Sequence, residues 1–126
     1  MKIQYGMKAA PLYMEQLKDR IDKFKQLKSN PIIELHLFSE TDILDKKGLE
    51  ICLENCESIK QYQPRFIVHF PHQDISGKIF DPFVDGDETV LKALDFSCGI
   101  SATAIVMHRY CCLDRNLSFD EAEQLF

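Results

Sequence analysis

Short apolar runs alternate four times with amphipathic segments along this chain, and that order restricts the fold more than any other feature. Runs such as PIIELHLF and RFIVHFPH have the length and the aliphatic and aromatic content of buried strands, whereas the intervening segments repeat apolar residues at helical spacing. Strands that alternate with helices form βαβ units, in which the strands are parallel and the crossovers are right-handed. The sequence therefore predicts an α/β protein built on a parallel sheet.

Apolar periodicity and helix breakers set the expected bounds of the elements. We expect strands at Lys2–Met7, Ile32–Phe38, Arg65–Phe70 and Ala102–Met107, and helices at Leu12–Lys28, Lys46–Gln61 and Glu88–Cys98. Pro11 suits a first helical turn, and Pro31 ends the first helix because the residue before a proline avoids the helical region. Ser118 and Glu121 have capping-box spacing, which predicts a fourth helix near the last residues.

Each expected helix has one apolar face that should pack on the sheet. The faces are Leu17, Ile21, Phe24 and Leu27 in the first helix, Leu49, Cys52, Leu53, Cys56 and Ile59 in the second, and Leu91, Leu94 and Cys98 in the third. Gly99 follows the third helix at the position where a glycine commonly ends a helix.

The number of units selects one fold among the parallel α/β architectures. Eight βα units make a (β/α)8 barrel of about 250 residues, so the 126 residues supply four units. We therefore predict a half TIM barrel, with residues 1–126 forming one partial (β/α)4 domain that is the N-terminal half of a barrel. The competing fold, a doubly wound sheet, predicts a glycine-rich turn after the first strand. The sequence there is MKAAP, with Gly6 alone before it.

Composition narrows the classes of function. The chain is 45% hydrophobic and 28% charged, which is typical of a globular protein, and its formal net charge of −5 gives no electrostatic footprint for nucleic acid. No apolar run has the length of a membrane span or a signal peptide core, so we expect a cytoplasmic protein that does not bind membranes. The odd count of five cysteines predicts free thiols.

Ionisable residues stand near the C-terminal ends of three expected strands. They are Glu34 and His36 in PIIELHLF, His69 in RFIVHFPH and His108 in TAIVMHRY. A buried ionisable group is costly unless it is hydrogen-bonded, metal-bound or facing an open mouth. Because parallel strands end at the same edge of a sheet, these residues predict one shared site. Alternation along the strand places Glu34 and His36 opposite the side chains that face the helices.

The strand patterns IIELHLF, FIVHFPH and AIVMHRY resemble the first half of the xylose isomerase-like TIM barrels. That superfamily contains sugar phosphate isomerases and epimerases and the endonuclease IV-type DNA repair enzymes. In the endonuclease branch, histidines at the ends of strands three and four bind zinc, which implies that His69 and His108 are metal ligands. In the sugar isomerase branch, the histidines of this half would contact substrate hydroxyls. The acidic charge favours the sugar branch, and therefore a sugar or sugar phosphate as substrate.

The resemblance and the strand positions together give the candidate residues. They fall into three roles, namely catalytic Glu34 and His36, metal-binding His69 and His108, and substrate-binding His69, His72, His108 and Arg109. The expected cofactor is a divalent cation, zinc, manganese or magnesium. Each assignment has a structural alternative: a strand histidine can be hydrogen-bonded to a neighbour in the core, and Glu34 can form an ion pair with Lys8.

Three functions remain open from the sequence. The first is the N-terminal part of a metal-assisted sugar or sugar phosphate isomerase or epimerase, inactive alone. The second is a fragment of an endonuclease IV-like zinc phosphodiesterase. The third is a non-catalytic half-barrel, because exposed strand edges and a cut barrel face require a cover. All three predict self-association or a complementing half-barrel.

Overall fold

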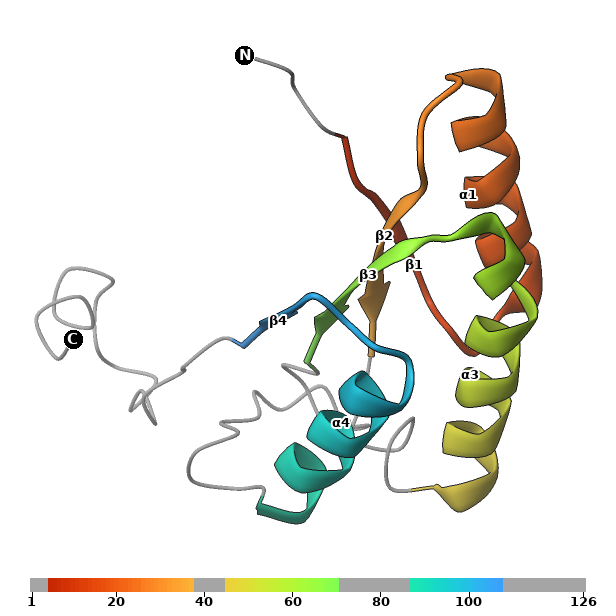
Figure 1. The fold of residues 1–126 in the computed structure, drawn as a ribbon. Coiled ribbons are helices and arrows are strands. Elements are labelled where there is room, and N and C mark those ends of the chain that lie inside the picture. Colours follow the sequence, from red (N-terminus) through yellow and green to blue (C-terminus); the bar gives the residue numbers. More distant parts are fainter. Residues whose placement is uncertain (1–4, 38–44, 71–86, 108–126) are drawn as a thin grey trace, which may run out of the picture.

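The computed structural model describes residues 5–37, 45–70 and 87–107; for residues 87 and 89 it describes the backbone alone. Its elements follow one another as strand, helix, strand, helix (Figure 1). In chain order they are β1 (Met7–Ala9), α1 (Met14–Gln26), β2 (Ile32–His36), α3 (Lys46–Ser58), the 3-10 turn η1 (Lys60–Tyr62), β3 (Arg65–His69), α4 (Asp87–Gly99) and β4 (Ala104–Val106).

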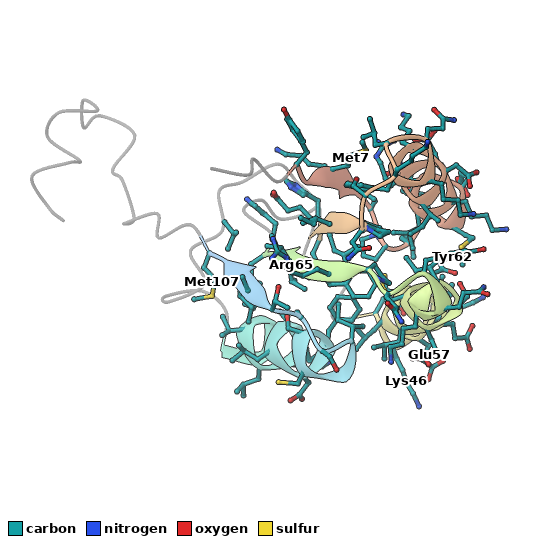
Figure 2. The ribbon with its side chains drawn as sticks, turned by 45° about the horizontal axis from the view of Figure 1, so that its top comes forward. Met7, Lys46, Glu57, Tyr62, Arg65 and Met107 are labelled. Atoms are coloured by element: carbon teal, nitrogen blue, oxygen red, sulfur yellow. The ribbon has the colours of Figure 1, made fainter. Side chains whose placement is uncertain are left out.

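The four strands form one parallel sheet in the order β1-β2-β3-β4. Each strand therefore pairs with its neighbour in sequence, whereas a doubly wound sheet reverses its strand order at a switch point. The helices α1, α3 and α4 lie along one side of the sheet, as Figures 1 and 2 show. This arrangement confirms the predicted α/β class and is consistent with half of a (β/α) barrel.

The core lies between that side of the sheet and the helices. Alternate residues of the two central strands, and the residue that follows each strand, point into it and are buried, namely Ile33, Leu35, Leu37, Phe66, Val68 and Phe70. The helices contribute Leu17, Ile21 and Phe24 from α1, Cys52 and Cys56 from α3, and Ala93 and Phe96 from α4. Each fully buried large side chain contributes about 1.5 to 3 kcal/mol, so this layer holds the helices on the sheet.

The ends of α1 and α3 are formed in different ways. Helix α1 begins at Met14, after Pro11 rather than with that proline in its first turn, and Tyr13 before it makes no side-chain capping bond. The Asp45 side chain caps α3 by accepting a 3.1 Å hydrogen bond from the backbone N–H of Lys47. Lys28, with φ at 51°, turns the chain after α1. The predicted helix to Gln61 is α-helical only to Ser58 and then tightens into η1, before Gln63 in the left-handed region leads into β3.

The first strand was predicted too early in the chain. The prediction was Lys2–Met7, but β1 is Met7–Ala9, where it pairs with Ile33–Leu35 of β2, and Tyr5 is 67% exposed. Alanine has a low strand propensity, so nothing in the sequence indicated that the strand continues through Ala9. The small alanine side chains fit between the first strand and α1, where Ala9 and Ala10 are buried.

The prediction of which face of α4 points inward was also wrong. Leu91 is 62% exposed and Leu94 and Cys98 are exposed, whereas Ala93, Phe96 and Ile100 are buried. Both sets have the same helical spacing, and the larger aromatic ring of Phe96 gains more from burial. Leu27, which was predicted to lie on the buried face of the first helix, is likewise 58% exposed at the end of α1.

Gly99 is the last residue of α4, and it does not adopt the left-handed conformation expected of a glycine that ends a helix. The left-handed residue after this helix is Ser101, with φ at 57°. A Cβ atom at Gly99 would lie 3.4 Å from Cδ2 of Leu53, which is an ordinary van der Waals contact, so the packing of α4 on α3 does not require glycine there.

Burial controls the acidity of a thiol in α3. Cys52 and Cys56 are buried thiols outside any disulfide, and desolvation, followed by the neighbouring Cys52, raises the pKa of Cys56 from 9.0 to about 12. An unfolded chain releases this proton near pH 9, and the folded chain does so only near pH 12. Between these values the unfolded state binds fewer protons, so rising pH favours unfolding.

We therefore expect alkaline pH to destabilise the wild type more than Cys56→Ala. At pH 10.5 the difference should reach about 2 kcal/mol relative to pH 8, from about 1.4 kcal/mol for each pH unit of unequal protonation. Urea unfolding at both pH values measures it. Cys98→Ala removes an exposed thiol and serves as the control. Parallel pH dependence in wild type and Cys56→Ala would contradict the assignment.

Candidate metal centre

The face of the sheet opposite the helices carries polar side chains. Register places Lys8 beside Glu34 and Glu34 beside Ile67. One step further along the strands, His36 lies beside His69. Side chains two residues apart on a strand share a face, so Glu34, His36 and His69 meet near the C-terminal ends of the two central strands, as predicted.

Glu34 and His36 form a close pair within β2. The distance from Glu34 Oε1 to His36 Nε2 is 2.6 Å, and both side chains are only partly exposed. An ionised carboxylate can only accept a hydrogen bond, so it places the proton of the imidazole on Nε2. In the neutral ring the lone pair of His36 is then on Nδ1. The alternative prediction for Glu34 was an ion pair with Lys8, but no ion pair of Lys8 occurs among the described residues.

His69 is oriented by the backbone and stacked on His36. Its Nδ1 lies 2.9 Å from the carbonyl oxygen of Phe70, and the residue is only 8% exposed. A carbonyl only accepts, so Nδ1 carries the proton and the lone pair of the neutral ring is on Nε2. The rings of His36 and His69 stack with centroids 4.3 Å apart and planes 14° from parallel.

The three side chains form a donor group that suits a divalent metal ion. Glu34, His36 and His69 each offer one ligand atom, and these atoms all lie within 4.8 Å of one another. Two imidazoles and a carboxylate are the ligands that zinc and similar transition metals prefer. A zinc-binding histidine usually donates its other ring N–H to a carboxylate or a carbonyl. Both histidines have such an acceptor here, Glu34 for His36 and Phe70 for His69.

Coordination requires a modest movement of these side chains. Tetrahedral zinc with bonds of about 2.0 to 2.1 Å separates its ligand atoms by about 3.3 Å, which is less than the upper limit of the observed spacing. Imidazole lone pairs lie in the ring plane, so two nearly parallel stacked rings must rotate before their nitrogens converge on one ion. Coordination by His36 Nε2 would also break the bond to Glu34, whereas coordination by Nδ1 keeps that bond.

The structure brings three of the predicted site residues together. Glu34 and His36, predicted as catalytic, and His69, predicted to bind metal and substrate, are brought together. The other predicted residues, His72, His108 and Arg109, lie outside the described residues, and so does the predicted fourth helix.

Two residues near the donor group were missed from the sequence. A cavity of about 340 Å³ adjoins His36 at the end of β1, and its lining residues are Lys8, Ala9, Ala10, Gln16, Arg20 and His36. Gln16 and Arg20 are four apart in α1, which puts them on one helix face. The alternation of acidic and basic residues in this helix hid them, because it is typical of a solvated face.

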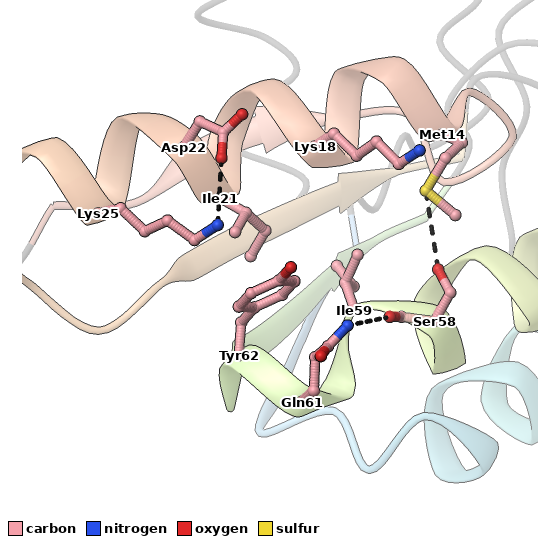
Figure 3. Close-up of a pocket in the computed structure, with 9 residues that line it drawn as sticks. All are labelled: Met14, Lys18, Ile21, Asp22, Lys25, Ser58, Ile59, Gln61 and Tyr62. Carbon is pink, nitrogen blue, oxygen red and sulfur yellow. Dashed lines mark hydrogen bonds and ion pairs between the residues drawn. The ribbon is translucent and has the colours of Figure 1, made fainter.

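A second cavity, of about 360 Å³, lies far from the donor group, between α1 and the end of α3 (Figure 3). Several of the polar groups that line it bind one another. Lys25 forms a 3.3 Å ion pair with Asp22, and its Nζ lies 4.4 Å from the centre of the Tyr62 ring. This cavity is a packing groove between helices and offers no group for chemistry at the sheet.

No protein-family model matches the chain, and neither curated proteins nor solved structures gave a match. Membership in the xylose isomerase-like superfamily therefore stays a prediction from the strand patterns. None of the helices within the described ranges has both the length and the apolar character that a bilayer span requires.

Proposed function

We propose that this chain provides the first half of a xylose isomerase-like barrel that isomerises or epimerises a sugar or sugar phosphate with the help of a divalent metal. The observation that carries the proposal is the Glu34, His36 and His69 donor group at the C-terminal ends of adjacent parallel strands. Barrel enzymes place their chemistry at this end of the strands. In the proposed barrel, further βα units, from the same polypeptide or a partner, close the open face.

Each of the three residues has a role that follows from its contacts. His69, with its proton held on Nδ1 by the Phe70 carbonyl, presents Nε2 as a metal ligand, and His36 supplies the second imidazole. A bound divalent cation supplies a Lewis acid for the substrate oxygens. In this assignment Glu34 orients His36 instead of binding the metal itself, and its carboxylate is the group that can accept a proton from a carbon next to a carbonyl.

The proposal predicts stoichiometric and selective metal binding. Calorimetric titration of the metal-free chain should give one zinc per chain, with zinc bound more tightly than manganese and manganese more tightly than magnesium, because imidazole ligands favour zinc. Glu34→Gln keeps the shape of the side chain but weakens the acceptor and removes the charge. We expect it to lower zinc affinity about 10- to 100-fold.

Glu54→Gln is the matched control, because Glu54 is exposed on α3 and distant from the sheet face. Its zinc affinity should equal that of the wild type. Zinc binding that is absent, or insensitive to Glu34→Gln, would overturn the metal centre. We expect no sugar isomerisation by the 126-residue chain alone with zinc, manganese or magnesium. Metal-dependent turnover by that chain would contradict the half-barrel part of the proposal.

A further inference from the structure

We infer that the cavity beside His36 is a phosphate-binding subsite formed by Lys8, Gln16 and Arg20. The inference deepens the proposed function, on which it rests for the identity of the group that carries the phosphate. It selects a phosphate monoester as the substrate class, with the phosphate at the end of β1 and the remainder of the molecule beside His36. The volume of the cavity, about 340 Å³, is within the range of small-molecule sites.

Arg20 is fixed at the rim of the cavity by contacts that leave donors for a ligand. Its Nε donates a 2.7 Å hydrogen bond to the Lys8 carbonyl, and a terminal nitrogen pairs with Asp19. A guanidinium has five N–H donors, so these contacts use only part of its capacity. Asp19 is also bound by Lys23 at 2.8 Å, which is the first cause that holds the pKa of its carboxyl below the usual value. The Asp19 charge is therefore shared between two cations.

Gln16 and Lys8 add donors of two other kinds. The side-chain oxygen of Gln16 accepts a 2.9 Å hydrogen bond from the backbone N–H of Ala10, which assigns the orientation of the amide. Its NH2 group is then the end that can donate to a ligand. Lys8 is exposed, and within the described ranges no ion pair engages its ammonium group.

The donor set matches phosphate better than a carboxylate. A phosphate monoester carries a charge of about −1.5 to −2 at pH 7 and three acceptor oxygens. The ammonium of Lys8, the guanidinium of Arg20 and the amide of Gln16 supply two positive charges and donors from three separate side chains. The nearest acidic neighbour of Lys8 across the sheet, Glu34, is already bonded to His36.

Titration of the full chain with inorganic phosphate tests the subsite. The protein is treated with EDTA and kept at low ionic strength, and phosphorus NMR follows binding. We expect Lys8→Met to raise the dissociation constant about tenfold, because one charge-assisted contact is lost. Arg20→Lys keeps the charge but loses the planar fork, so we expect about a fivefold increase. Circular dichroism verifies that each variant is folded.

Lys18→Met is the control. It also removes one positive charge, but Lys18 lies on α1 and lines the other cavity, which Figure 3 shows. Unchanged affinity in Lys8→Met, equal losses in Lys8→Met and Lys18→Met, or acetate binding as tight as phosphate would each overturn the subsite. Zinc titration distinguishes the two proposals. Phosphate binding without zinc binding would reject only the metal centre, and the reverse result would reject only the phosphate subsite.

Discussion

Replacement of Val68 by aspartate will unfold the protein, whereas the same replacement at the adjacent Ile67 will leave it folded. Val68 is fully buried against the helices, and Ile67 lies on the opposite face beside Glu34. A carboxylate at position 68 loses the burial of the valine, about 1.5 to 3 kcal/mol, and adds a desolvation cost of several kcal/mol. Together these costs approach the whole stability of a small domain, about 5 to 15 kcal/mol.

At position 67 the new carboxylate can reach water, because Ile67 is only partly buried. We expect it to lower the free energy of unfolding by at most about 2 kcal/mol. Far-UV circular dichroism and urea titration at low protein concentration measure both variants. Equal destabilisation at the two positions would contradict the one-sided sheet, since it would show that the second face is buried as deeply as the first.

The sequence was sufficient to predict the order of elements and the first residues of the two central strands. Pro31 and Pro64 stand just before β2 and β3, and both strands begin at the predicted residues, Ile32 and Arg65. The edge strand β1 was placed wrongly because only pairing with β2 defines it. Alanines with low strand propensity occupy that place, and no local signal marks them as a strand.

In the candidate site too, features set by local sequence could be predicted, and features set by packing between elements could not. Glu34, His36 and His69 could be grouped from the sequence, because strand alternation and the common edge of parallel strands depend on local rules. The stacking of the two rings depends on the register between β2 and β3, which the sequence does not display. Arg20 could not be found at all, since its hydrogen bond to Lys8 depends on how α1 packs on β1.

Substitution of His69 separates its role as a ligand from its role in packing. With zinc at 100 times its dissociation constant, the wild type should gain about 2.7 kcal/mol, or roughly 10 °C in melting temperature. His69→Ala and His69→Phe both remove the ring nitrogens, so both should lose this shift, with zinc affinity reduced about 100-fold or more. Differential scanning calorimetry with and without zinc gives both quantities.

The two variants should differ from each other in the stability of the metal-free protein. Phenylalanine retains a ring that can stack on His36, as His69 does at 4.3 Å, although it loses the hydrogen bond to the Phe70 carbonyl. Alanine removes the ring as well, so we expect His69→Ala to be less stable than His69→Phe by about 1 kcal/mol or more. A zinc-dependent shift that persists in His69→Phe would show that the metal binds elsewhere. A shift lost only in His69→Ala would make the ring structural, because stacking alone would then account for the effect.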